Sequence, residues 1–521
     1  MEPVDRHQLD ADARFDGGDL DCGNGLLLLI RQHMDPMERG QLLEFRSTEI
    51  SVEEDFPAWC RMTGNELVSF VRRGKERSFL VCKGKLAERQ STRRVSAAAL
   101  APVTRQPVAV TIPTALPAPS AAPTVRSLSV MGIGSWPRPR WMLQAIHDHL
   151  EGRLGEAAFE ATGDDAARLA VDAQVRAGVD VVSDGEQRRD NYASFVGGRL
   201  DNCQLIPLTD LLPLVDDPEK FEREMRSLDV PASEVRHPAL FGPLGRSRPL
   251  AGHEHAFLRT LTDKPVKIAL PGPYLLTRLM WLECLSDRVY RSREHLADDV
   301  VRVLREELHF LLAAGVSLVQ VDEPVLAEVV YTGAKNTRSF MCGALSEKGD
   351  ADRELQLARD LINRVVAGLP RARLALHVCR GNWTRNEEAA LAGDYRPLVS
   401  LLSSLDVGTL FLELCTPRAG ELDVLADLPR DIRVGVGVVN QKHERIEPVE
   451  EIADRARRAV KLFGPDRVLL TPDCGFATFA DNPVASGSSR RGQAAGHRRS
   501  RRARAARVTR RPPIVSAAEN H

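Results

Sequence analysis

Four side chains of metal-binding type lie at the ends of apolar runs in the second half of the chain: His377, Cys379, Glu413 and Cys474. His377 and Cys379 are two residues apart, and residues with that spacing on a strand point the same way. Glu413 is one residue from the end of the next run, and Cys474 closes the last one. Imidazole, carboxylate and soft thiolate together are typical zinc ligands. The pattern therefore predicts a zinc site.

The pair His377 and Cys379 would be weak evidence alone. A buried cysteine is usually a small apolar group and a single histidine a satisfied core residue. Cys415 is a competing thiol, but it falls one residue past its run and has no matching partner. The joint placement of four such residues at strand ends favours metal binding.

The elements that would position these residues alternate short apolar runs with longer amphipathic segments. Eight runs are present: 129–135, 179–185, 266–272, 316–323, 373–379, 409–414, 433–439 and 467–474. Helical patterns separate several of them, at 164–178, 294–314, 354–368 and 449–464. Eight strands in strand-to-helix alternation predict an α/β fold, a (β/α)8 TIM-type barrel, rather than an open doubly wound sheet. In such a barrel the strand ends form the catalytic rim.

Composition shifts divide the chain into four parts. Residues 8–86 have the order strand, helix, strand, helix, strand, strand, which predicts a small α+β domain. Residues 87–127 are an Ala/Pro-rich linker, 128–486 the barrel, and 487–521 an Arg-rich tail. The tail has three interpretations: a disordered segment, a basic arm for nucleic acid, or the product of a reading frame shifted near Ser486.

The barrel segment resembles the catalytic domain of cobalamin-independent methionine synthases. The motifs that carry the resemblance are G-I-G-S-W-P, S-D-G-E-Q-R-R-D-N-Y, V-Q-V-D-E-P, H-V-C, F-L-E-L and T-P-D-C-G, in the family's order. The resemblance implies methyl transfer to the thiolate of homocysteine, giving methionine. It implies that His377, Cys379, Glu413 and Cys474 bind Zn²⁺, and that Ser135, Glu186 and Asp322 hold the amino acid part of homocysteine.

The residue types fit these roles. Two thiolates and a carboxylate leave the zinc site with a net negative charge, so a coordinated substrate thiol stays nucleophilic after losing its proton. Glu186 and Asp322 offer two acceptors to an ammonium group. The alternative for Glu186 is a surface acid or a helix cap.

The chain departs from the family pattern in ways that leave the methyl donor open. Full-length members carry a second barrel that helps to bind polyglutamylated folate, so the donor here is either a methylfolate or a methylcorrinoid protein. Asn440 and Lys442 stand where members often show Asp and a His or Lys, which leaves a proton-handling role there undecided, and His443 is expected to be solvated. Two other functions fit: a zinc-dependent alkyltransferase of the epoxide:thiol type, and a sulfur-relay protein with a structural zinc.

The N-terminal segment resembles TusA-like sulfur-carrier proteins. The resemblance rests on D-L-D-C-G-N-G before the first helix, W-C-R-M-T-G-N-E-L, and C-K-G-K in the closing strand. It implies that Cys22 could carry a persulfide and act with a sulfur-relay protein. A thiol near a helix N-terminus is expected to have a lowered pKa. The family's P-x-P after the cysteine is replaced by Gly23-Asn24-Gly25, so a structural role is the alternative; Cys60 and Cys82 are expected in the core.

The overall composition bears on the expected location of the protein and on the ligands it could bind. The formal net charge of −1 gives no general attraction to nucleic acid. No run reaches the roughly 18 apolar residues of a membrane span, and the N-terminus lacks signal-peptide features, so a cytoplasmic protein is expected. Nine irregularly spaced cysteines predict free thiols rather than a disulfide framework. No phosphate-binding glycine motif opens a helix, which argues against nucleotide binding.

Overall fold

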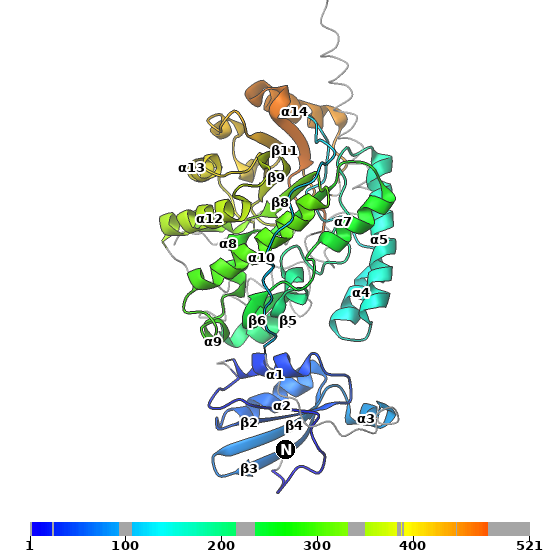
Figure 1. Ribbon diagram of the computed structural model, residues 1–521, viewed down its shortest axis with the longest axis vertical. Coiled ribbons are helices and arrows are strands. Elements are labelled where there is room, and N and C mark those ends of the chain that lie inside the picture. The colour runs from blue at the N-terminus through cyan, green and yellow to red at the C-terminus, as the bar shows by residue number, and fades with distance from the viewer. Residues whose placement is uncertain are drawn as a thin grey trace, which may run out of the picture.

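A computed structural model describes residues 3–22, 25–92, 107–214, 235–331, 350–382, 387, 390–443 and 445–477. An N-terminal α+β unit lies beside a larger α/β barrel (Figure 1). The predicted Arg-rich tail, and with it the frame-shift interpretation, falls outside the described residues. Within them, no helix is both long and apolar enough to cross a membrane.

The N-terminal unit is a four-stranded sheet covered by two main helices. Its elements are β1 (Ala13–Asp16), α1 (Leu26–Met34), β2 (Leu42–Ser47), α2 (Val52–Thr63), β3 (Glu66–Arg73), β4 (Glu76–Cys82) and α3 (Leu86–Thr92). The strand order is β1-β2-β4-β3, with β1 parallel to β2 and the other pairs antiparallel. Phe45, Phe56, Trp59 and Phe79 stack in the core between sheet and helices. The predicted order of elements up to residue 86 is confirmed.

The barrel is built on a six-stranded parallel sheet, which two further segments close. The strands are β7 (Lys267–Pro271), β8 (Leu318–Asp322), β9 (Leu374–Val378), β10 (Thr409–Leu412), β11 (Arg433–Val439) and β12 (Val468–Pro472), adjacent in chain order. Parallel bridges Val130↔Leu470, Met131↔Val181 and Val182↔Val266 complete the ring. All eight predicted runs thus take part, and the α/β barrel fold is confirmed.

The first two runs contribute isolated bridges rather than full strands. Met131 N donates to Leu470 O (3.1 Å) and Lys267 N donates to Val182 O (2.9 Å), so backbone hydrogen bonds cross both seams. Glycines interrupt the first run at 132 and 134, and Gly185 ends the second in the left-handed region (φ +77°). Both segments leave extended geometry early, which brings their next residues over the barrel mouth.

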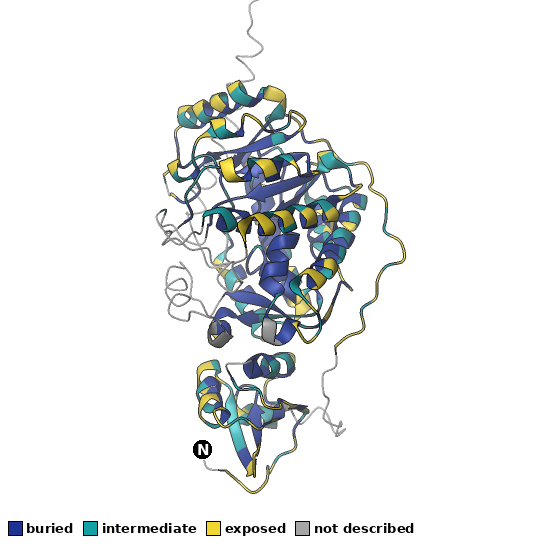
Figure 2. Ribbon diagram, turned by 90° about the vertical axis from the view of Figure 1, so that its left-hand side faces the viewer, coloured by how far each residue is buried: buried dark blue, intermediate teal, exposed yellow. Residues whose placement is uncertain are grey.

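Helices surround the strands. They are α4 (Arg140–Leu150), α5 (Glu156–Ala177), α7 (Gly252–Leu261), α8 (Pro273–Met280), α9 (Glu283–Ser286), α10 (Arg293–Ala313), α11 (Val325–Tyr331), α12 (Ala351–Val366), α13 (Val399–Ser403) and α14 (Val449–Phe463). The four predicted helices correspond to α5, α10, α12 and α14. Figure 2 shows buried strands at the centre and helices exposed on their outer faces.

An antiparallel hairpin not expected from the sequence links the second and third runs. It pairs β5 (Asp201–Pro207) with β6 (Arg236–Gly245). Helix α1 of the N-terminal unit lies against this hairpin (Figure 1): Gln204 Nε2 donates to Asp35 Oδ2 (2.6 Å), and Arg31 pairs with Asp210 (2.7 Å). Leu28 of α1 belongs to the barrel's apolar core, while Leu26 and Ile30 belong to the core of the N-terminal unit. Helix α1 is therefore shared by both cores.

Candidate metal centre

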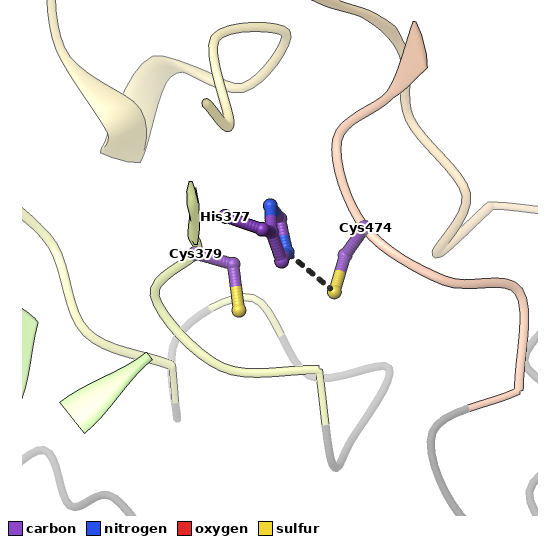
Figure 3. A group of neighbouring side chains, drawn as sticks. All are labelled: His377, Cys379 and Cys474. Carbon is purple, nitrogen blue, oxygen red and sulfur yellow. Dashed lines mark hydrogen bonds between the residues drawn. The ribbon is translucent and has the colours of Figure 1, made fainter. Parts of the chain in front are cut away.

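His377, Cys379 and Cys474 converge at the C-terminal rim of the barrel. One possible ligand atom from each lies within 4.8 Å of the others. Figure 3 shows the imidazole of His377 between the two sulfur atoms, with a hydrogen bond joining its Nε2 and Cys474 Sγ (3.6 Å). His377 is the fourth residue of β9, Cys379 follows that strand, and Cys474 follows β12, so two non-adjacent strands supply the group. These are the donor types and the spacing that a zinc ion requires.

The imidazole of His377 is oriented by a hydrogen bond at its other nitrogen. Nδ1 lies 3.1 Å from the carbonyl oxygen of Phe411 on the neighbouring strand β10. A carbonyl oxygen can only accept, so Nδ1 carries the proton and Nε2 is the nitrogen left with a lone pair. A histidine whose second N–H donates to a carbonyl is the usual arrangement around protein-bound metals.

The thiols of Cys379 and Cys474 differ in how readily they ionise. Hydrogen bonding with Cys474 and the neighbouring imidazole of His377 lower the pKa of the Cys379 thiol well below its ordinary value, against the opposing effect of burial. Cys379 is thus the thiol more readily ionised, and metal ligation needs the thiolate.

Glu413 lies beside this group but outside the 4.8 Å cluster. Its Oε2 accepts from the backbone N of Arg380 (2.8 Å), the residue after Cys379, and its Oε1 pairs with Arg418. Its backbone N donates to the Tyr395 hydroxyl (2.9 Å). The predicted fourth ligand therefore lies next to the cluster of His377, Cys379 and Cys474, while its carboxylate is held by the Arg418 guanidinium and the backbone amide of Arg380.

Asp473 fixes the loop that brings Glu413 and Cys474 together. Its Oδ1 accepts from the backbone N of Leu414 (2.9 Å) and of Cys415 (2.9 Å). The thiol of Cys415 points elsewhere, toward Glu447 Oε1 (3.8 Å), and burial raises its pKa. Sequence reasoning missed Asp473, although an aspartate directly before a candidate ligand at a strand end is a signal for such a role.

The three predicted substrate residues lie on the same rim. Ser135 Oγ accepts from Ala477 N (3.2 Å), just past Cys474, and a Cβ on Gly475 would approach Ser135 Oγ to 2.2 Å. A Cβ on Gly134 would meet Glu186 Oε1 at 2.0 Å, so this carboxylate packs against the residue before Ser135. Asp322, at the end of β8, adds to the raised pKa of Glu186 through like charge, so the two acids lie near each other on this rim.

Glu186 occupies an unusual backbone conformation. Its φ is +55°, a region that costs non-glycine residues free energy, and its N–H donates to Asp184 Oδ1 (2.9 Å). Burial raises the pKa of its carboxyl to about 7, Arg189 opposes the shift, and Asp322 adds to it. Its side chain is 4% exposed, so the alternative of a surface acid is wrong.

Lys442 has an environment that the sequence did not reveal. Its side chain is 3% exposed, and Nζ has no hydrogen-bond partner in the described part of the chain. Burial and then Arg418 lower its pKa, while Glu413 and Cys474 oppose them, so the ammonium faces the metal group. Asn440 Oδ1 accepts from Lys442 N (2.9 Å), and His443 is exposed, as expected.

Cys22 does not have the activated environment that its position predicts. It precedes α1, but it is 7% exposed, and burial with Asp55 and Asp21 raises its pKa to about 12. The expectation of a lowered pKa is wrong, because burial among apolar residues and carboxylates outweighs the effect of the helix N-terminus. Cys60 and Cys82 are core residues, as predicted.

Comparison with known proteins identifies a family, and named relatives, that the barrel segment matches. Residues 128–495, more than half of the chain, match the family described as "Cobalamin-independent synthase, Catalytic domain". A "Methionine synthase" from Sulfolobus acidocaldarius is 27% identical over 345 residues, covering 66% of this chain and 84% of the relative. One from Saccharolobus solfataricus is 25% identical, covering 66% and 86%.

Two solved structures share the barrel fold. A B12-independent methionine synthase from Shewanella sp. W3-18-1, in complex with selenomethionine, superimposes with a TM-score of 0.56 at 23% identity, covering 74% of this chain and 99% of that one. A putative vitamin-B12 independent methionine synthase from Listeria monocytogenes gives a TM-score of 0.50 at 16% identity, covering 74% and 98%.

Proposed function

Because the chain belongs to the family of cobalamin-independent synthase catalytic domains, we propose that it transfers a methyl group to the thiol of homocysteine at a zinc ion held by His377, Cys379 and Cys474, with Glu413 as fourth ligand. The observation that carries the proposal is the convergence of the three ligand atoms within 4.8 Å on the catalytic rim of the barrel. The resulting product is methionine.

The donor set supports zinc. The His377 Nδ1–H bond to Phe411 O directs Nε2 to the metal, and the two thiols supply soft anionic ligands. A bound zinc ion supplies a Lewis acid that lowers the pKa of a substrate thiol. Glu413 would complete the set if zinc were bound, its carboxylate then replacing its present pairing with Arg418.

Ser135, Glu186 and Asp322 are proposed to bind the amino acid end of the substrate. The two acids are buried and carry like charge, so an ammonium bound by both reduces their repulsion and gains two charge-assisted hydrogen bonds. Their position on the rim beside Cys474 orients the substrate thiol toward the metal group. This pairing favours an amino acid thiol over the substrates of an epoxide:thiol alkyltransferase.

For the methyl donor we propose a methylfolate. The family's description as cobalamin-independent favours a folate over a methylcorrinoid protein. Turnover assays with methyltetrahydrofolate, its polyglutamate form and a methylcorrinoid protein test this choice. Methionine formed only with the corrinoid donor would reverse it.

For the chain as a whole we propose four parts: an N-terminal domain at 8–86, a linker at 87–127, the barrel at 128–486 and a tail at 487–521. The separate sheet and core of residues 13–82 support the first boundary. The burial of Cys22 argues for a structural role of the N-terminal domain rather than persulfide transfer with a sulfur-relay protein.

X-ray absorption at the zinc edge, with and without homocysteine, tests the central proposal. We expect one additional sulfur neighbour of zinc when homocysteine is added. An unchanged coordination shell would indicate a structural zinc and would remove the proposed mechanism.

A further inference from the structure

Lys267 is a buried cation inside the barrel for which the proposed reaction provides no role. It is the first residue of β7, and its side chain is 2% exposed. Its Nζ donates to Gly132 O (2.6 Å) and Gln320 Oε1 (2.7 Å), and lies 4.5 Å from the centroid of the Phe411 ring. A buried ammonium requires such partners. Burial lowers the pKa of Lys267 to about 7 while Asp322 and Glu186 oppose the shift, so the chain keeps a buried ionisable amine near the two predicted substrate acids.

Gln320 connects this cation to the substrate site. An ammonium has three donors and no acceptor, so the end of Gln320 that faces Lys267 must be the carbonyl Oε1. The amide Nε2 is consequently turned to Asp322 and donates to its Oδ1 at 2.6 Å. Lys267 thus decides which end of Gln320 meets the carboxylate.

The hydrogen bond from Gln320 sets the position of a substrate-binding acid. Asp322 ends β8, is 5% exposed, and shares the rim with Glu186. A carboxylate at a strand end can rotate about two side-chain torsions, and a short bond from a fully buried amide holds one orientation. If Gln320 were flipped, its carbonyl would face Asp322 and repel it.

We infer that Lys267, acting through Gln320, is a positioning residue that holds the Asp322 carboxylate in the orientation that accepts the ammonium of homocysteine. This inference rests on the proposed function. Selectivity for a thiol that carries an amine would then depend on three linked residues, Lys267, Gln320 and Asp322. The first of them, Lys267, lies outside the substrate site.

The experiment compares two thiols that differ only in the amine. Homocysteine is titrated calorimetrically against zinc-loaded protein, in parallel with 4-mercaptobutanoate, which keeps the thiol and carboxylate but lacks the amine. The variants are Lys267→Met, which removes the cation, and Gln320→Glu, which keeps an acceptor for Lys267 but places a carboxylate against Asp322. Ile268→Val, one residue along the same strand and within the apolar core, is the matched control.

We expect both variants to raise the dissociation constant for homocysteine by about tenfold or more, and that for 4-mercaptobutanoate by less than about twofold. Zinc content should be unchanged, and Ile268→Val should resemble wild type. If Lys267→Met does not fold, Gln320→Glu alone carries the test.

Equal weakening of both thiols, or unchanged homocysteine binding, overturns the inference while leaving the proposed function in place. If wild-type protein binds neither thiol, the proposed function fails, and the inference fails with it.

Discussion

In the proposed zinc site, His377, Cys379 and Cys474 supply three of the four ligands, so each thiol should be needed to hold the ion. We predict that Cys379→Ser and Cys474→Ser each lose most of the bound zinc, measured by mass spectrometry of the purified protein. A serine hydroxyl is a poor substitute for a thiolate.

Cys415→Ser is the control, since its thiol turns toward Glu447. It should retain zinc at the wild-type level. Zinc loss in this variant, or retention in both of the others, would contradict the assigned ligands.

With Glu186 in the proposed role of ammonium acceptor, substrate binding should depend on pH. Burial raises the pKa of its carboxyl to about 7, so the ionised form that accepts an ammonium is lost as pH falls below 7. We predict that the KM for homocysteine rises by up to about tenfold per pH unit below 7, as expected for one protonation. Steady-state assays from pH 5.5 to 8.5 measure this.

Glu186→Gln serves as the comparison for the pH profile. Its KM should be high at every pH and nearly independent of it across the same range. A variant profile with the wild-type slope would assign the titration to another group.

At the level of single residues, the sequence indicated candidate site residues where a side chain of metal-binding type lies at the end of an apolar run. His377, Cys379 and Cys474 could be identified because polar groups stand out at the ends of apolar runs. The raised pKa of Cys22 could not be predicted, because it depends on burial in a core assembled from distant segments. The contact of Glu413 with Arg418 also depends on the folded loop.

At the level of elements, a carboxylate joins strand β8 to helix α8. Glu323, directly after β8, accepts from the backbone N of Tyr274 (2.8 Å) and Leu275 (2.9 Å) in the first turn of α8. A Cβ on Gly272 would lie 2.1 Å from Glu323 Oε1. We predict that Gly272→Ala lowers the free energy of unfolding by about 2–3 kcal/mol, measured by urea denaturation.

Gly132→Ala is the matched control for this substitution. A Cβ at position 132 would meet nothing within 4 Å. We expect a change of less than about 1 kcal/mol there. Equal destabilisation by both substitutions would show that the displaced Glu323 carboxylate is not the cause.

The elements that could be predicted are those with a strong period. The helices α5, α10, α12 and α14 have clear amphipathic patterns, and the eight apolar runs mark the barrel. The hairpin β5–β6 was not predicted, because Asp201–Pro207 is only partly buried and lacks regular alternation. The first two runs form isolated bridges rather than full strands. This was not predicted, because the effect of their glycines depends on the neighbouring strands.

At the level of the whole molecule, helix α1 couples the N-terminal unit to the barrel. Leu28 packs in one core and Leu26 in the other, and the Arg31–Asp210 pair is mostly buried. We predict one calorimetric unfolding transition for the wild type, and two separate transitions for Leu28→Asp, because a buried unpaired charge breaks the contact. Arg364→Ala, which removes an exposed ion pair with Asp298, should keep the single transition.

The closure of the barrel has a further consequence for how the protein is made. Val130 pairs with Leu470, so the ring is joined by segments from opposite ends of the barrel sequence. Contacts of such long sequence separation form late in folding. A nascent chain that has passed Cys379 but not yet reached Cys474 lacks both the last strand and one of the three grouped donors. Zinc binding at the proposed site should therefore follow synthesis of the last strand, and zinc uptake would report closure of the ring.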